Sequence, residues 1–344
     1  EWGFEGIVIS DWGGDIDAAK SLKAGLDLGM PDSNGYFQKQ LESAIKNGTI
    51  KEEDLDEACR RIIECVLKFR ATDSLSGASS DEDVQDKTAL ELALDSAVLL
   101  KNDGFLPLSS KKTSELCVIG SLASNMRFQG GGSSHITTRP FGSALENLRS
   151  EFSVFYEDGY VSTFCPSKKR NRLNKALYEK AIKLAKECSQ KNIPILIFAG
   201  LTDSYEGEGF DRDSLSLPGE QITLIKDILE ISDNVALVTF SGSPIDLTFA
   251  QKSRAILHMY LCGQGSSRAC CDLLCGKANP SGKLAETWPL TSSPLLAEFE
   301  KQRDDFEINY KEGTLVGYRY YETKNLPVQY EFGYGLSYTN FGYS

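Results

Sequence analysis

Residues 193–201 read IPILIFAGL and residues 235–240 read VALVTF, two short apolar runs that contain β-branched side chains. Between them, residues 219–231 (GEQITLIKDILEI) place apolar side chains at the three- and four-residue spacing of a helix. Strands with apolar side chains on both faces are typical of a buried parallel sheet, in which a helix connects consecutive strands. This stretch therefore predicts an α/β domain with a mostly parallel sheet.

Strands and helices are expected to alternate through the rest of this region. The other strand candidates are residues 116–120 and 255–261, and the other helix candidates are residues 174–190 and 267–274. The apolar residues 89–100 predict one more helix, so the domain is expected over residues 89–344. From about residue 291 the sequence is aromatic and irregular, and we expect Tyr318, Tyr320 and Tyr321 to pack back on the domain.

Residues 1–70 are expected to form a separate, smaller unit. Its candidates are strands at residues 6–10 and 24–30 and helices at residues 15–22, 36–46 and 52–69. The last of these helices repeats apolar residues every three or four positions, which predicts one apolar face. Residues 71–88 are rich in Ser, Asp and Gly and have no apolar period, so they predict a linker between two domains.

The composition limits the kinds of partner that the protein can have. The chain has 344 residues, of which 41% are hydrophobic and 25% charged, a balance typical of globular proteins with more than one domain. A formal net charge of -12 repels nucleic acid and anionic membrane surfaces. No apolar run approaches the roughly 20 residues that span a bilayer. We therefore expect a neutral small-molecule ligand, no nucleic acid and no membrane.

Nine cysteines are present, an odd number, and four of them lie close together at Cys262, Cys270, Cys271 and Cys275. The chain has only two histidines, which disfavours a zinc site, and Cys271 and Cys275 fall one helical turn apart in an apolar stretch. We interpret the group as buried free thiols, with zinc as the alternative. Abundant unpaired cysteine favours a reducing, cytoplasmic location. Neither a metal nor a cofactor is predicted.

One carboxylate follows directly on an apolar strand candidate. Residues 1–12 read EWGFEGIVISDW, so that Asp11 and Trp12 come after the run GIVIS of residues 6–10. That run has the pattern of a strand buried on both faces, and β/α barrel enzymes carry their catalytic groups at the carboxyl ends of such strands. The alternative is that Asp11 caps the helix that follows.

The pattern GF-x-G-x-x-x-SDW at residues 3–12 resembles the nucleophile segment of glycoside hydrolase family 3, the β-glucosidase family. The resemblance continues in order along the chain, through AGLDLGMP (24–31), LLKNDGFLPL (99–108), GGGSSH (130–135), EGEGFDR (206–212), LPGEQ (217–221), NPSGKLAETWP (279–289) and FGYGLSYTNF (332–341). It implies that residues 1–70 are the C-terminal part of a catalytic (β/α)8 barrel and that residues 89–344 form an α/β sandwich domain.

Two β/α units cannot close an eight-stranded barrel. We therefore expect a fragment that lacks most of the N-terminal barrel and is inactive by itself. The resemblance implies that the tail, residues 291–344, leads toward a fibronectin-like domain, which we expect to be absent from this chain. The groups that grip the sugar in the early barrel strands would also lie upstream of residue 1.

The resemblance implies a retaining, exo-acting β-glucosidase that cleaves terminal non-reducing β-D-glucosyl residues by a double displacement. Such an enzyme needs two carboxyl groups, one as nucleophile and one as acid and then base. Asp11 matches the nucleophile. The acid/base is expected on the glycine-rich loop after residues 193–201, where Glu208 precedes Gly-Phe-Asp-Arg and Glu206 is the runner-up.

Three further residues are candidates for binding the sugar. Trp12 offers a ring that can stack on a pyranose, while Arg127 and His135 flank the glycine-serine loop and offer polar contacts. For each of them the alternative is a purely structural role. Asp27, in AGLDLG, is expected to be a structural hydrogen-bond acceptor at a strand end.

Two other functions stay open at the level of the sequence. The protein can be a β-xylosidase or another glycosidase of the same family, because specificity depends on groups that the two carboxylates do not reveal. It can also be a non-catalytic binding module. The expected ligand is a β-glucoside or an oligosaccharide, and assembly into a homo-oligomer is left open.

Overall fold

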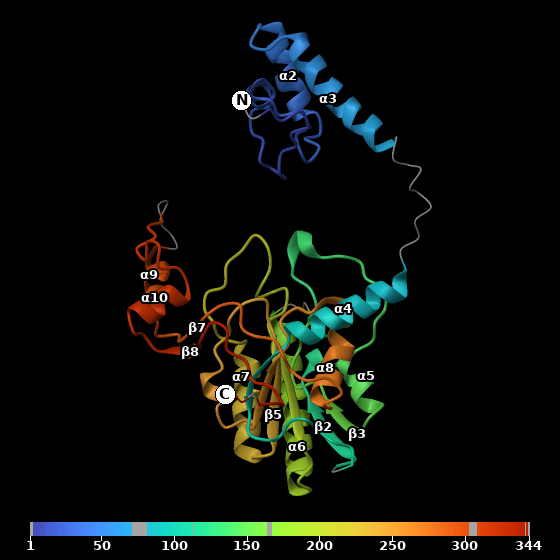
Figure 1. Ribbon diagram of the computed structural model, residues 1–344, viewed down its shortest axis with the longest axis vertical. Helices are drawn as coiled ribbons and strands as arrows, with labels where there is room; N and C mark the ends of the chain where they lie inside the picture. Colours follow the sequence, from blue (N-terminus) through green and yellow to red (C-terminus); the bar gives the residue numbers. More distant parts are fainter. Residues whose placement is uncertain are drawn as a thin grey trace. The chain divides into compact units, whose positions relative to one another are not determined.

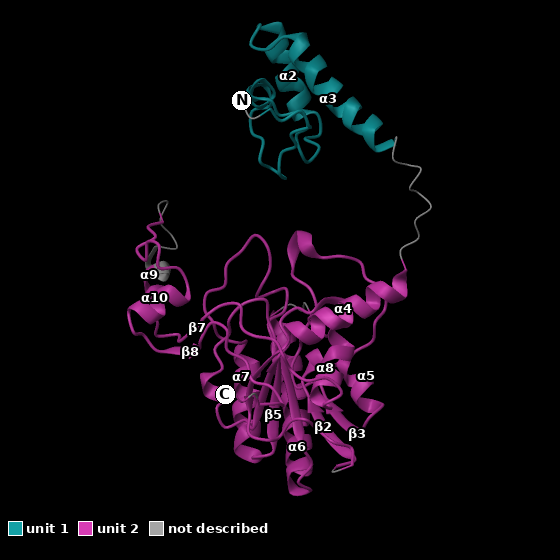
Figure 2. Cartoon of the chain, viewed as in Figure 1, with its two compact units in different colours: residues 1–80 teal, residues 81–344 magenta. Residues whose placement is uncertain are grey.

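The computed structural model describes residues 3–70, 81–111, 113–163, 167–302, 308–340 and 342. The chain forms two compact units, Glu1–Ser80 and Asp81–Ser344, each of which is described by itself (Figure 2). Residues 71–80 of the predicted linker lie outside the described residues. The remainder of that linker is helical, because helix α4 spans Glu82–Ser96 and the Asp81 side chain caps its first turn.

The second unit is built on a six-stranded sheet, as the apolar runs predict. Its strands are β1 (Val98–Asn102), β2 (Glu115–Ile119), β3 (Ser153–Glu157), β4 (Ile195–Gly200), β5 (Val235–Phe240) and β6 (Ala255–His258), in the spatial order β1-β6-β5-β4-β2-β3. Strands β2 to β6 are parallel, and β1 pairs antiparallel with β6 at one edge. The unit is therefore an α/β fold with a mostly parallel sheet.

Helices cover this sheet on both sides (Figure 1). They are α4, α5 (Ala144–Arg149), α6 (Ser167–Gln190), α7 (Gly219–Ile231) and α8 (Ser266–Leu274). Helix α6 packs against α7, and α4 and α5 pack against α8. Every residue of β4 and β5 is buried between these layers. Such double coverage explains why both strands are apolar on both faces.

The predicted helix over residues 89–100 is wrong at its C-terminal end. Helix α4 stops at Ser96, and Val98, Leu99 and Leu100 belong to β1, where each is at most 1% exposed. A short apolar run fits a buried helix and a buried strand equally well, and only the open edge beside β6 decides between them.

The tail is more regular than expected. It contains α9 (Pro294–Gln302), α10 (Tyr318–Thr323) and β8 (Val328–Tyr330), which pairs with β7 (Trp288–Pro289). Tyr321 is buried and its hydroxyl lies 3.1 Å from the Ser293 hydroxyl, as expected of a residue that packs on the domain. Tyr318 stacks on Phe332 with the ring centroids 5.0 Å apart, although its side chain is exposed, and Tyr320 is half-buried against Tyr321.

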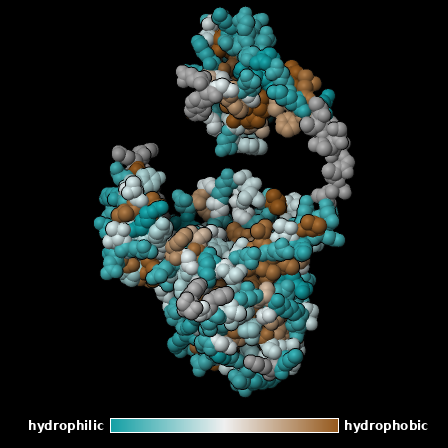
Figure 3. Space-filling model, in the orientation of Figure 1, coloured by the Kyte–Doolittle hydropathy of each residue, from teal (hydrophilic) through white to brown (hydrophobic). Residues whose placement is uncertain are grey.

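The first unit consists of α1 (Ala18–Ala24), α2 (Tyr36–Lys46) and α3 (Glu52–Arg70) around a small core. Its two strand candidates lie parallel and exchange backbone hydrogen bonds around a bridge between Ile9 and Leu28, but they form no regular strands. Ile9 is 49% exposed and Val8 43%, so the predicted burial on both faces is wrong for this unit. The reason is that residues 6–10 have a neighbouring segment on one side only, and apolar side chains reach the surface (Figure 3).

The clustered cysteines are free thiols, as predicted. Cys270 and Cys271 are buried, Cys262 and Cys275 are half-buried, and the sulfur atoms of Cys271 and Cys275 lie 3.9 Å apart. Within the described residues, no three His, Cys, Asp or Glu side chains gather in a way that suits a metal ion. None of the described helices has the length and apolar character that would let it cross a membrane.

Candidate functional site

The first candidate carboxylate lies on a tight turn in the first unit. The Gly14 N–H donates to the Asp11 carbonyl at 3.0 Å, and Gly13 has φ 77° inside this turn, a conformation that favours glycine. Ser10 N–H donates to the Leu28 carbonyl at 3.0 Å, and Gly13 N–H donates to the Met30 carbonyl at 3.1 Å. Asp11 is thus placed at the end of two adjacent, parallel segments.

The carboxylate of Asp11 is exposed and nearly free of partners. One of its oxygens accepts the Trp12 N–H at 2.7 Å. The helix-cap alternative is excluded, because Asp17 is the N-cap of α1 and accepts the Lys20 N–H at 3.1 Å. Trp12 is 74% exposed, so it is not a core tryptophan in this unit. Both side chains are available to a ligand.

Asp27 has the structural role that was expected of it. Its carboxylate is fully buried and accepts the Val8 N–H at 2.8 Å and the Arg61 Nε at 2.8 Å. It therefore joins the two parallel segments to helix α3. This fixed, paired carboxylate contrasts with Asp11, which lies on the same edge but is left accessible.

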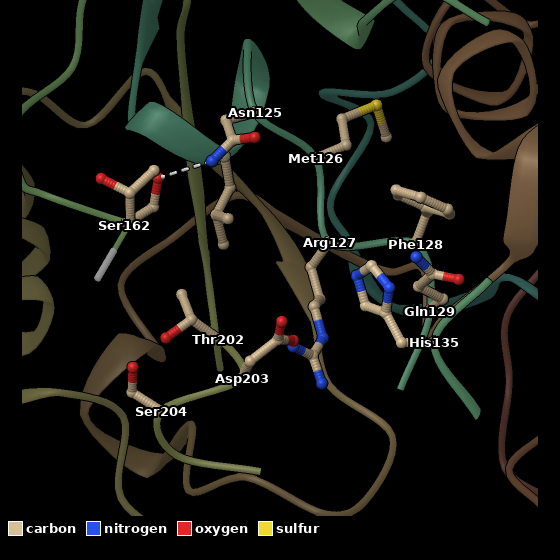
Figure 4. A pocket seen from close by; sticks show the side chains of 12 residues that line it. Asn125, Met126, Arg127, Phe128, Gln129, His135, Ser162, Thr202, Asp203 and Ser204 are labelled. Carbon is tan, nitrogen blue, oxygen red and sulfur yellow. Dashed lines mark hydrogen bonds and ion pairs between the residues drawn. The ribbon is translucent and has the colours of Figure 1, made fainter. Parts of the chain in front are cut away.

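In the second unit, a cavity of about 320 Å³ opens where β2 and β4 end. It is lined by the β2 loop (residues 120–135) and the β4 loop (residues 201–218), together with Ser162 and Thr163 (Figure 4). Adjacent parallel strands bring their following loops to the same edge of a sheet, which is the usual place for a ligand in such folds. Two of the predicted binding residues, Arg127 and His135, line this cavity.

The second candidate carboxylate, Glu208, is exposed on the β4 loop and contacts the β2 loop. One carboxylate oxygen accepts the Ser133 N–H at 2.5 Å, and the Glu208 N–H donates to the Gly131 carbonyl at 3.4 Å. Hydrogen bonds from the Ser133 side chain and backbone hold the pKa of the Glu208 carboxyl below its ordinary value. Gly132 is required here, because a Cβ on it would lie 2.4 Å from the Glu208 Cβ.

The runner-up, Glu206, is half-buried and engaged on both carboxylate oxygens. One oxygen accepts the Gly242 N–H at 2.7 Å, and the other accepts the Ser243 hydroxyl. Both oxygens of this carboxylate are therefore already engaged by the fold, which leaves it less acceptor capacity for a substrate than Glu208 has. Of the two glutamates, the geometry therefore favours Glu208 as the group that meets a ligand.

Arg127 and His135 differ in how they line the cavity. Arg127 is 5% exposed, and its guanidinium pairs with the neighbouring Asp203 (Figure 4). The guanidinium also donates to the Glu206 carbonyl at 3.0 Å. Burial lowers the pKa of Arg127. The His135 side chain is exposed, and the His135 backbone N–H donates to the Gly132 carbonyl at 3.1 Å. Arg127 thus holds two loops together, whereas the His135 ring is open to a ligand.

Sequence reasoning missed three residues of this edge. Ser133 donates to Glu208, Asp203 pairs with Arg127, and Ser243 donates to Glu206. For Ser133 and Asp203 a signal existed, since both lie in polar loops that follow apolar strands. Ser243 gave none, because only the pairing of β4 with β5 brings it near.

The chain matches two described domain families, Glycosyl hydrolase family 3 N terminal domain over residues 1–65 and Glycosyl hydrolase family 3 C-terminal domain over residues 97–338. It is 39% identical to thermostable beta-glucosidase B of Acetivibrio thermocellus, across 100% of this chain and 44% of that protein. It is 38% identical to exo-alpha-(1->6)-L-arabinopyranosidase of Bifidobacterium longum, across 99% of this chain and 45% of that protein. The chain thus spans less than half the length of these relatives.

Two solved structures agree with these matches. The GH3 beta-glucosidase of Bifidobacterium adolescentis aligns with a TM-score of 0.78 at 37% identity, covering 98% of this chain and 48% of that one. Beta-glucosidase 3B of Thermotoga neapolitana in complex with glucose aligns with a TM-score of 0.78 at 27% identity, covering 99% and 51%. These matches show that the chain belongs to glycoside hydrolase family 3.

Proposed function

We propose that the protein is a retaining, exo-acting β-glucosidase in which Asp11 is the nucleophile and Glu208 the acid/base. The proposal rests on a contrast between two carboxylates in each unit, Asp11 with Asp27 in the first and Glu208 with Glu206 in the second. Both carboxylate oxygens of Asp27 and of Glu206 accept hydrogen bonds within the fold, whereas among the described residues the exposed Asp11 and Glu208 each accept on one oxygen.

In this mechanism the Asp11 carboxylate attacks the anomeric carbon and displaces the leaving group, which takes a proton from Glu208. Glu208 then removes a proton from water, which attacks the glycosyl–Asp11 ester and releases the sugar with retention. The hydrogen bonds from Ser133 favour the ionised form of Glu208, the form that the second step needs. The first step needs the protonated form, so the Ser133 contact must weaken when a substrate oxygen approaches.

Trp12 and His135 are proposed to contact the sugar directly. An exposed indole beside the nucleophile can stack on the apolar face of a pyranose, and the exposed His135 ring can bond a hydroxyl. Arg127 is assigned a supporting part, because its buried guanidinium is already held by Asp203 and Glu206.

One alternative sugar has a specific basis. The Bifidobacterium longum relative, almost as similar as the Acetivibrio thermocellus enzyme, is an arabinopyranosidase. A β-xyloside is the other substrate within the family. Aryl β-D-glucoside, α-L-arabinopyranoside and β-D-xyloside of one leaving group, compared by kcat/KM, will rank the three; we expect the glucoside first.

The two-carboxylate assignment is tested by trapping the intermediate. Incubation of the intact protein with a 2-deoxy-2-fluoro-β-glucoside bearing a dinitrophenyl leaving group should leave one fluorosugar on the protein. Peptide mass spectrometry should place it on Asp11, and the Asp11→Asn variant should not be labelled. Stable labelling of another carboxylate would overturn the assignment, and complete absence of labelling and turnover would favour a binding module.

A further inference from the structure

We propose that Glu206 is the positioning residue of this site, a clamp that fixes the loop carrying Glu208 to the two neighbouring loops. The proposal rests on the assignment of Glu208 as the acid/base and deepens it. Glu206 lies two residues before Glu208 on the β4 loop, and it makes contacts to both neighbouring loops.

The side chain of Glu206 ties the β4 loop to the β5 loop (residues 241–247). Gly242 donates its N–H to one carboxylate oxygen at 2.7 Å, and the Ser243 hydroxyl donates to the other. Strand β5 ends at Phe240, so these donors are held at the end of a buried strand. Charged acceptors form the stronger class of hydrogen bond, which suits a carboxylate for this purpose.

The backbone of Glu206 ties the same loop to the β2 loop. Its carbonyl accepts Arg127 Nη2 at 3.0 Å, and the Arg127 guanidinium also pairs with Asp203. Arg127 is buried, so its charge is stabilised by these contacts and by the nearby Glu206 carboxylate. Three loops, each following a different parallel strand, therefore converge on a single glutamate.

The clamp sets the position of Glu208 because the β2 loop packs closely against the β4 loop beside it. A Cβ on Gly131 would lie 3.3 Å from both the Glu206 carbonyl oxygen and the Gly207 Cα, a tight contact. On the other side of Glu208, Arg212 donates to the Pro244 carbonyl at 2.8 Å, a second link to the β5 loop. Glu208 is thus held from both directions.

A general acid must lie within hydrogen-bond reach of the leaving oxygen, and a misplacement of 1 Å can cost about 10²-fold in rate. Loss of the clamp should therefore act most on substrates that need protonation of a poor leaving group. The test uses the intact protein with Glu206→Ala, Glu206→Gln and, as a matched control, Glu179→Ala, an exposed glutamate on helix α6.

We expect Glu206→Ala to lower kcat/KM on phenyl β-glucoside by about 10- to 100-fold, and to change it far less on 2,4-dinitrophenyl β-glucoside. Glu206→Gln should recover most of the loss, because its amide oxygen can accept from Gly242 and its amide nitrogen can donate to Ser243. Glu179→Ala should match the wild type. Hydrogen exchange of residues 203–213 should speed up only in Glu206→Ala.

Three results would overturn the clamp. If Glu206→Gln is as impaired as Glu206→Ala and azide restores its turnover, Glu206 is itself the acid/base. If Glu206→Ala slows both aryl glucosides equally and only lowers the unfolding temperature, its role is merely structural. If exchange of residues 203–213 is unchanged, there is no clamp. Should the wild type hydrolyse no glycoside, faster exchange in Glu206→Ala alone would still support the clamp while the proposed function fails.

Discussion

Two short apolar runs are each followed by a carboxylate on a glycine-containing loop, but one run is buried in the sheet and the other is largely exposed. Residues 195–200 form β4, in which every side chain is at most 1% exposed, and Glu208 follows on the next loop. Residues 6–10 form no regular strand, Val8 and Ile9 are nearly half exposed, and Asp11 follows. β4 has parallel neighbours on both sides, whereas residues 6–10 have one neighbouring segment.

Burial of the apolar run and placement of the carboxylate after it are therefore two separate properties, although one sequence pattern predicts both. An apolar run indicates that a segment can be buried. Whether it is buried depends on the neighbouring strands and covering helices of the fold. The carboxylate that follows is placed by hydrogen bonds to the neighbouring segment in both regions, with or without a covered strand. Substitutions in either region test this difference between burial and placement.

Asp11→Asn should have the largest effect. An amide cannot attack the anomeric carbon, so glycosylation in the intact protein should fall by several powers of ten. Turnover of an aryl β-glucoside measures the loss, and the neighbouring Asp17→Asn is the control, because Asp17 caps α1 and pairs with Lys20 on that helix. Near-normal activity of Asp11→Asn would remove residues 6–11 from the catalytic site.

Glu208→Gln should have the next largest effect, on the order of 10²- to 10⁴-fold for a poor leaving group, because proton transfer is lost. On a dinitrophenyl glucoside the first step should survive, and added azide should then give a β-glucosyl azide. Chromatography of the products checks this. An equal loss for all leaving groups, without any azide product, would contradict the acid/base assignment.

The effect of burial on stability is tested by Ile197→Ala and Ile9→Ala in the 344-residue chain, whose free energies of unfolding are compared. Ile197 is fully buried in β4, so its truncation should cost about 2–5 kcal/mol of the free energy of unfolding. Ile9 is 49% exposed, so the same change should cost about 1 kcal/mol or less. Urea denaturation followed by circular dichroism measures both. A cost at Ile9 equal to that at Ile197 would mean that residues 6–10 are covered in solution.

Ser133→Ala should have the smallest effect, a shift in pH dependence. The Ser133 hydroxyl is one of two donors that lower the pKa of Glu208, so its removal should raise that pKa. A general acid works only while protonated, and the fraction protonated falls above its pKa. The basic limb of the kcat/KM profile should therefore move to higher pH. A shift to lower pH would contradict the role of this hydrogen bond.

The sequence by itself determined most of the local structure and the identity of the candidate carboxylates. Helices α2 and α7 and strand β5 have the predicted bounds, because their periodicity and flanking residues act over a few positions. The structural role of Asp27 also followed from its place at a strand end. The free thiols at Cys270 and Cys271 followed from an apolar setting with too few histidines for zinc.

Only the tertiary structure decided how differently the two glutamates of this motif are engaged by the fold. Glu206 and Glu208 stand in the same short motif, and nothing local distinguishes them as acceptors. The distinction arises because β4 lies between β2 and β5, which brings Gly242 and Ser243 to one glutamate and Ser133 to the other. Likewise, Val98–Asn102 form a strand because they pair with the edge of β6, whose residues lie more than 150 positions later in the sequence. Contacts of long sequence separation are set by topology, and no periodicity within a segment encodes them.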